Sequence, residues 1–245
     1  MEKRRADVLL VERGLFESRA KARAAIEAGR VFADGRPVAR ASDLIAIEAQ
    51  IAAEAAHPWV GRGALKLVHA LDLWPIAVGG RVVLDVGAST GGFTEVCLAR
   101  GAARVYAVDV GQGQLHPRLA ADPRVVSLEG VDARRLDAAL VPEAPELVVC
   151  DASFIGLSKV LPVPLSLAAP GADLVALVKP QFEAGPGAVG KGGLVKDPAV
   201  RAAALEAAKQ FFESSGWRVR GEAESPIAGG EGNLEFLVWA RKGGR

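Results

Sequence analysis

Five short apolar segments rich in β-branched residues recur between residues 82 and 179, with stretches of helix length between them. They are residues 82–85, 104–109, 125–128, 147–151 and 174–179. Because these runs are apolar throughout rather than alternating, both faces of each strand are predicted to be buried. The spacing therefore predicts an α/β domain in which a mostly parallel sheet lies between two layers of helices.

The C-terminal part of the chain adds a long helix and two further strands. Asp197 followed by proline is typical of a helix start, and the helix is predicted to run to Ser215, with Gly216 ending it. Residues 217–222 and 234–241 are predicted to form an antiparallel pair at the sheet edge. The predicted sheet then has seven strands.

The first forty residues carry a local excess of positive charge, although the net charge of the chain is only +1. They predict a small α+β module with helices over 6–13 and 19–28 and a hairpin that turns at Asp34-Gly35. Residues 41–60 are Ala-rich without periodicity and predict a linker. The predicted domains are a basic module with its linker, residues 1–57, and an α/β body, residues 58–245.

The cations of this module predict a surface for RNA phosphates. Its candidate RNA-binding residues are Arg19, Lys21, Arg23 and Arg30. Three of them recur at helical spacing along one stripe, which a merely solvated helix face explains equally well. Their concentration at one end of the chain and the sparse acids among them favour phosphate binding, which positions an RNA without reading its sequence.

A glycine-rich segment, residues 85–94, joins the first strand of the body to a helix. Its glycines let the backbone approach a ligand at the carboxyl edge of the sheet, although a tight turn explains the same composition. The glycine spacing matches neither the dinucleotide-binding nor the phosphate-loop pattern. The predicted cofactor contacts in this segment are Asp85, Gly87, Ala88, Ser89, Gly91, Gly92 and Phe93.

Two further acids extend this predicted cofactor site. Asp109 ends the second strand, where a carboxylate suits a pair of ribose hydroxyls. Asp132 follows the third strand, where it either contacts an adenine or caps a helix. Acidic walls without a phosphate site favour a cationic adenosyl ligand, and S-adenosylmethionine fits because its sulfonium is positively charged.

Four charged residues lie in apolar surroundings, where an unpaired charge is costly. They are Lys66, Asp151, Lys179 and Glu235. Asp151 and Lys179 end the fourth and fifth strands, so both are predicted at the ligand-binding edge. A structural Lys–Asp ion pair is the alternative interpretation.

The body resembles the RrmJ/FtsJ-type ribose 2′-O-methyltransferases, whose Lys-Asp-Lys-Glu tetrad falls here on Lys66, Asp151, Lys179 and Glu235 in the same order. The strings that carry the resemblance are residues 85–95, 108–115, 179–183 and 232–236. Residues 9–38 resemble an S4 RNA-binding module, so the whole chain is similar to the TlyA (haemolysin A-like) family. The sequence departs from the family pattern at Ala64, which replaces a glycine, and at Asp132, where Asn is frequent.

The resemblance implies an S4-like RNA-binding domain followed by a Rossmann-like methyltransferase domain that uses S-adenosylmethionine. It implies methylation of a cytidine 2′-hydroxyl in ribosomal RNA, with ribosomal subunits as partners. Lys179 would be the general base if burial and the neighbouring Lys66 lower its pKa, while Asp151 and Glu235 hold the ammonium groups. No metal is required, since the three histidines lack ligand spacing.

Other function classes remain as alternatives or are disfavoured. A thiolate mechanism is disfavoured because Cys150 continues an apolar strand and Cys97 lies on a helix, so both are predicted in the core. A membrane-lytic protein is disfavoured because the longest uncharged run, residues 160–172, is too short to span a bilayer. A non-catalytic ribosome-assembly factor remains the alternative. Few cysteines and no signal-like N-terminus predict a cytoplasmic protein.

Overall fold

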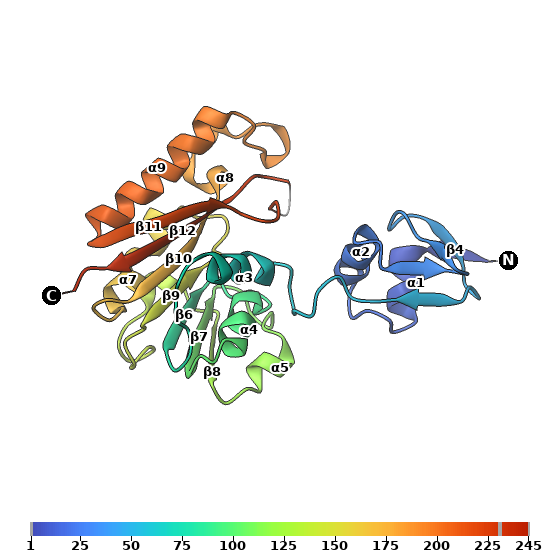
Figure 1. Cartoon of the computed structure of the whole chain (residues 1–245), viewed down its shortest axis with the longest axis horizontal. Helices are drawn as coiled ribbons and strands as arrows, with labels where there is room; N and C mark the ends of the chain where they lie inside the picture. Colours follow the sequence, from blue (N-terminus) through green and yellow to red (C-terminus); the bar gives the residue numbers. More distant parts are fainter. Residues whose placement is uncertain (1, 230–231, 245) are drawn as a thin grey trace. The chain divides into compact units, whose positions relative to one another are not determined.

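The structure of the protein, a computed structural model, describes residues 2–229 and 232–244 (Figure 1). The chain divides into two compact units, one ending at Pro58 and the other beginning at Trp59. The first unit contains β1 (Lys3–Arg5), α1 (Ala6–Glu12), α2 (Arg19–Glu27), β2 (Val31–Ala33), β3 (Arg36–Pro37), β4 (Leu44–Ala46) and β5 (Ile51–Ala53).

Local sequence signals start and end the elements of the first unit. The Ser18 hydroxyl accepts a hydrogen bond of 3.3 Å from the backbone N–H of Lys21 and so caps α2. Asp34 and Gly35 have φ angles of 50° and 75°, the left-handed pair that closes the β2–β3 hairpin. Both helices and β2 bury one small apolar core that includes Leu10 and Ile26.

The predicted linker over residues 41–60 is wrong up to residue 53, because this part contains two strands, β4 and β5. β4 pairs antiparallel with β1, and β5 pairs antiparallel with β2. Each strand is only three residues long, so no hydrophobic alternation could develop along it. Backbone pairing with β1 and β2, together with the packing of Ile45 and Ile51 against the core, holds this segment in place.

The second unit is built on a seven-stranded sheet, as the sequence predicts. Its elements are α3 (Ala64–Leu73), β6 (Val82–Val86), α4 (Gly92–Ala99), β7 (Arg104–Asp109), α5 (Pro117–Ala120), β8 (Val125–Glu129), η1 (Ala133–Arg135), β9 (Leu147–Cys150), α6 (Leu157–Val160), α7 (Pro162–Leu167), β10 (Asp173–Val178), α8 (Pro180–Glu183), η2 (Pro186–Ala188), η3 (Lys191–Gly193), α9 (Pro198–Ser214), β11 (Trp217–Glu224) and β12 (Phe236–Lys242). The strand order is β11-β12-β10-β9-β6-β7-β8.

Helices cover both faces of this sheet (Figure 1). One core cluster packs α6, α7 and α9 against residues such as Val148 and Ala176, and the other packs α3 and α4 against residues such as Val149 and Leu177. These successive strand residues point to opposite faces, which explains why the sequence is continuously apolar there. The loops that follow β6, β9 and β10 then emerge at one edge, because these strands are parallel neighbours.

The antiparallel strand β12 brings a distant part of the sequence to the same edge. β12 pairs with β10 in a register that sets Phe236 opposite Val178. Glu235, which precedes Phe236, is therefore placed beside Lys179, which follows Val178. The predicted edge pair of strands is confirmed, with β11 outermost and β12 inside it.

Candidate active site

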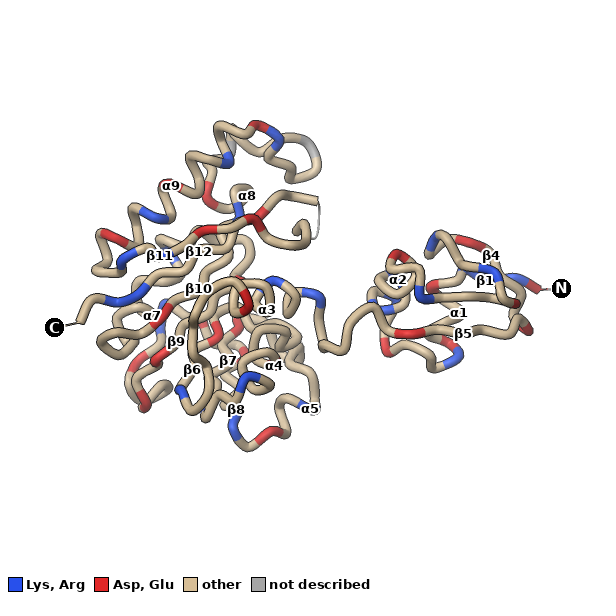
Figure 2. The backbone as a smooth tube through the Cα atoms, viewed as in Figure 1, with Lys and Arg blue, Asp and Glu red and all other residues tan. Residues whose placement is uncertain are grey.

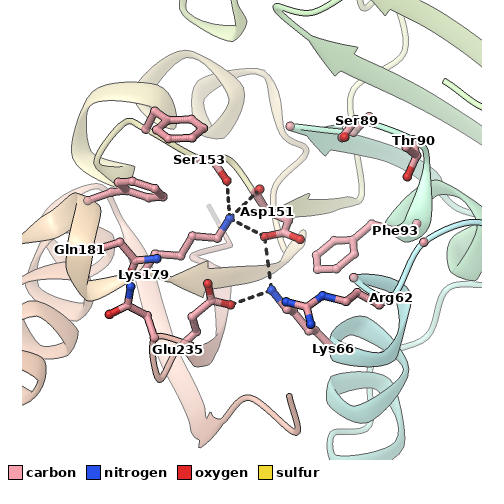
Figure 3. Close-up of a pocket in the computed structure, with 18 of the residues that line it drawn as sticks. Arg62, Lys66, Ser89, Thr90, Phe93, Asp151, Ser153, Lys179, Gln181 and Glu235 are labelled. Carbon is pink, nitrogen blue, oxygen red and sulfur yellow. Dashed lines mark hydrogen bonds and ion pairs between the residues drawn. The ribbon is translucent and has the colours of Figure 1, made fainter. Parts of the chain in front are cut away.

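A cavity of about 610 Å³ opens at the carboxyl edge of the parallel strands (Figure 3). All four residues of the proposed tetrad line it, together with five of the predicted cofactor contacts. Those five are Gly87, Ala88, Ser89, Gly92 and Phe93. The structure therefore brings the two predicted groups of residues into one space.

The four charged residues form a continuous chain of contacts across the cavity (Figure 3). Lys66 Nζ lies 2.6 Å from Glu235 Oε2 and 4.0 Å from Asp151 Oδ1. The same oxygen of Asp151 lies 2.7 Å from Lys179 Nζ. Both lysines are only 6% exposed and Glu235 is 2% exposed, so each ammonium group is paired where water has little access.

Two other oxygens surround the Lys179 ammonium group. Nζ donates a hydrogen bond of 2.7 Å to the Ser153 hydroxyl and one of 3.1 Å to the backbone carbonyl of Asp151. Ser153 lies two residues beyond Asp151 in the loop that follows β9. This short segment therefore supplies all three of these oxygens: the carboxylate and carbonyl oxygens of Asp151 and the Ser153 hydroxyl.

Small residues make room for the two carboxylates. A Cβ atom at Gly229 would lie 2.4 Å from Glu235 Oε1, and one at Gly63 would lie 3.2 Å from Asp151 Oδ2. Gly63 stands directly before α3, which carries Lys66. Glycine at these positions lets the backbone approach the charged groups closely, which a larger residue would prevent.

The glycine-rich loop combines left-handed backbone with close packing. Gly87 has a φ angle of 82°, and a Cβ atom there would lie 2.8 Å from the Cα atom of Ala152. Gly91 has a φ angle of 94°, but it does not line the cavity, because a Cβ atom there would collide with Leu119 instead. Gly91 therefore serves the packing of α5 against the loop, which the glycine pattern alone could not distinguish from a ligand contact.

Asp85 lies beneath the loop, outside the lining of the cavity. Its side chain is fully buried, and Oδ2 accepts a hydrogen bond of 2.7 Å from the Thr94 hydroxyl. Among the described residues, Oδ1 has no hydrogen-bond partner. Burial, with a smaller contribution from the nearby Asp151 carboxylate, raises the pKa of Asp85 to about 7.

The two other predicted cofactor acids also lie outside the cavity lining. Asp109 accepts backbone hydrogen bonds of 2.8 Å from Ser89 and from Gly111. It therefore orders two loops, the one that follows β6 and the one that follows β7. Asp132 caps the short helix η1, and its contacts with Arg134 lower its pKa to about 2. The capping role weighed for Asp132 is present, and its adenine contact stays a prediction.

The cavity includes residues that the sequence analysis did not single out as site residues. Arg62, Ser153, Phe154, Gln181 and Phe182 all line it. Phe154 is 91% exposed and has a φ angle of 65°, unusual for an aromatic residue, and its ring centre lies 5.1 Å from that of Phe182. The sequence shows an aromatic residue three positions after Asp151, but its exposure at the cavity is known only from the structure.

The predicted RNA-binding cations of the first unit are all paired with carboxylates. Arg19 contacts Asp7 at 2.6 Å and Arg23 contacts Glu27 at 2.6 Å. Lys21 pairs with Glu17 and Arg30 with Glu54, at 2.5 and 3.2 Å. Acidic residues are fewer than basic ones in the first forty residues, but a carboxylate lies beside each of these four cations, and Figure 2 shows acidic residues distributed with the basic ones along this unit. RNA binding by these cations stays a prediction.

Both cysteines are buried, as predicted. Burial raises the pKa of Cys150 to about 12 and that of Cys97 well above its usual value, so neither thiol is readily ionised. Within residues 2–229 and 232–244, no cluster of His, Cys, Asp or Glu could hold a metal ion. In the same ranges, no helix has the length and apolar character that crossing a membrane requires.

Comparison with known families identifies both units. Residues 59–242 match FtsJ-like methyltransferase, and residues 4–51 match the S4 domain. The chain belongs to the FtsJ-like methyltransferase family. This membership confirms the resemblance of the body, and the S4 match confirms that of the N-terminal module.

Individual relatives cover almost the whole chain. A 16S/23S rRNA (cytidine-2′-O)-methyltransferase, TlyA, from Mycobacterium tuberculosis is 49% identical over 97% of this chain and 89% of its own length. Hemolysin A from Brachyspira hyodysenteriae is 38% identical over 96% of this chain and 98% of its own. A solved structure from Streptococcus thermophilus is 38% identical, with a TM-score of 0.78 over 99% of this chain and 90% of that one.

More distant structures share the fold of the second unit. An S-adenosylmethionine-dependent methyltransferase from Listeria monocytogenes is 15% identical, with a TM-score of 0.56 over 74% of this chain and 99% of that one. These distant structures and the two family matches confirm the predicted fold class. Membership of the FtsJ-like methyltransferase family, with the close relatives, confirms the methyltransferase activity and S-adenosylmethionine as its cofactor.

Proposed function

We propose that this FtsJ-like methyltransferase methylates the 2′-hydroxyl of a cytidine in ribosomal RNA, with Lys179 as the general base. The observation that carries the proposal is the pair of buried lysines joined by Asp151 at the cavity that Gly87 and its neighbours line. The M. tuberculosis relative is named as a cytidine-2′-O-methyltransferase of ribosomal RNA, which supports the choice of a cytidine.

The residues at the glycine-rich loop fit the cofactor. Gly87 lets the backbone reach the cavity without a side chain, and Asp85 keeps a buried carboxyl oxygen with no partner among the described residues. Asp109 still has lone pairs for ribose hydroxyls beyond its two backbone bonds. Gly87, Ala88, Ser89, Gly92 and Phe93 would hold the cofactor. S-adenosylmethionine supplies a methyl group on a cationic sulfur.

The acid–base chemistry falls to the tetrad. A ribose hydroxyl is a poor nucleophile until its proton leaves, and a neutral Lys179 Nζ at the cavity would accept that proton. Nζ would keep this proton while the 2′-oxygen takes the methyl group that the cofactor supplies when bound. Asp151 and Glu235 hold the two lysine side chains in place, which keeps the reacting groups oriented.

The alternative of a non-catalytic RNA-binding factor makes a different prediction for one variant. Lys179→Met removes the proposed base but keeps a long side chain in the buried position. We expect 2′-O-methyl transfer to ribosomal subunits from cells lacking this protein to fall at least a hundredfold, because positioned base catalysis contributes about 10²–10⁴-fold. S-adenosylmethionine binding should persist. Normal turnover by Lys179→Met would refute the base assignment.

The methylated position can be found in the same experiment. Mapping 2′-O-methyl groups in rRNA from cells with and without the protein identifies the nucleotide and the subunit. Absence of any protein-dependent mark in either subunit, with transfer to no purified subunit, would favour the assembly-factor alternative over the proposed enzyme.

A further inference from the structure

The three oxygens around Lys179 Nζ differ in one chemical property. The Asp151 carboxylate oxygen at 2.7 Å and the Asp151 carbonyl oxygen at 3.1 Å can only accept hydrogen bonds. The Ser153 hydroxyl at 2.7 Å can accept one or donate one, because its hydrogen rotates. Of these three oxygens, only the Ser153 hydroxyl can pair with both forms of the lysine: it accepts a hydrogen bond from the ammonium group or donates one to the neutral amine.

A neutral amine has two hydrogens and one lone pair. If the lone pair faced either oxygen of Asp151, two acceptors would oppose each other in a site where Lys179 is only 6% exposed and water cannot easily intervene. Facing Ser153, the lone pair meets a hydroxyl hydrogen. When Lys179 is neutral, its favoured orientation is therefore the one in which the lone pair of Nζ points toward Ser153.

Ser153 also stands where a substrate hydroxyl has access. It lines the cavity, it is exposed, and it belongs to a loop segment outside any helix or strand. A ribose 2′-hydroxyl offers the same O–H group as serine. It would form the same contact with Nζ when it replaces the serine hydroxyl on that side.

We propose that Ser153 is a positioning residue for Lys179: its hydroxyl directs the lone pair of Nζ into the cavity and is then exchanged for the 2′-hydroxyl of the substrate. This inference rests on the proposed function. It also separates the two lysines, because the contacts that the structure shows for Lys66 Nζ are to the carboxylates of Glu235 and Asp151. Lys66 has no hydroxyl among these contacts, so the same orientation is not available to it.

The test measures single-turnover methyl transfer to ribosomal subunits at saturating S-adenosylmethionine. Ser153→Ala should lower the rate about tenfold, the equivalent of one lost hydrogen bond, while half-saturation by subunits and cofactor affinity stay within about twofold. Ser153→Thr, which keeps the hydroxyl, should restore most of the rate. Ser158→Ala is the control, since Ser158 is exposed on α6 and does not line the cavity.

Each outcome decides the inference separately from the proposed function. An unchanged rate in Ser153→Ala, with Lys179→Met inactive, overturns the role of Ser153 and leaves the base assignment standing. A rate lost equally in Ser153→Ala and Ser153→Thr, or lost together with cofactor affinity, shows a structural role and also overturns it. If the wild-type protein transfers no methyl group to either subunit, the proposed function fails and this inference fails with it.

Discussion

Asp85 is a buried carboxyl group that should make the second unit less stable as the pH rises. Its pKa is raised to about 7 by burial, from 3.8 in a solvated chain. The folded state thus keeps its proton up to about pH 7, whereas the unfolded state loses it near 3.8. The resulting stability is complete below pH 3.8 and is lost as the pH rises through 7.

The size of the effect follows from the two pKa values. Between pH 5 and pH 8 the unfolded carboxyl is already ionised, and the folded one changes from almost fully protonated to about nine-tenths ionised. This change removes about 2.6 kcal/mol of unfolding free energy, because over most of the two pH units from 5 to 7 the folded state holds one more proton than the unfolded state. Asp85→Asn cannot ionise, so the variant should lack this part of the pH dependence.

Urea unfolding at the two pH values measures the difference. All four tryptophans lie in the second unit, so their fluorescence reports on the unit that contains Asp85. The wild-type protein should lose about 2.6 kcal/mol more than Asp85→Asn on going from pH 5 to pH 8. Asp72→Asn is the control, because Asp72 is exposed and pairs with Arg100 at the surface. Equal losses in wild type and Asp85→Asn would refute the reasoning.

The position of the site could be predicted because it depends on strand direction alone. Residues that follow parallel strands meet at one edge of a sheet whatever the strand order, and Asp151 and Lys179 follow β9 and β10. Glu235 is different. It reaches that edge only because β12 runs antiparallel to β10 in a register that local sequence does not determine. Its place in the tetrad came from family resemblance.

Contacts between distant residues limited the rest of the prediction. Arg19 pairs with Asp7, twelve positions earlier, and this pairing depends on how α1 packs on α2. Gly91 looks like a ligand contact until Leu119 is seen against it. Ser153 lies two residues after Asp151 in the sequence, but nothing in the sequence indicates a partner for its hydroxyl. Only the structure shows that it accepts a hydrogen bond from Lys179.

Two further predictions test the two sides of the cavity. Gly87→Ala should weaken S-adenosylmethionine binding at least tenfold by calorimetry, because its Cβ atom would lie 2.8 Å from the Cα atom of Ala152. Gly171→Ala has a comparable left-handed φ, 76°, with nothing within 4 Å, so it controls for backbone strain and should bind normally. Equal affinities for both variants would show that the close approach at Gly87 does not matter. Phe154→Ala should raise half-saturation by ribosomal subunits about tenfold or more without changing cofactor affinity, since stacking on one base is worth about 1–3 kcal/mol. Because any aromatic face can stack, Phe154→Trp should remain close to wild type, and a tryptophan variant as weak as the alanine variant would argue against stacking by this exposed ring.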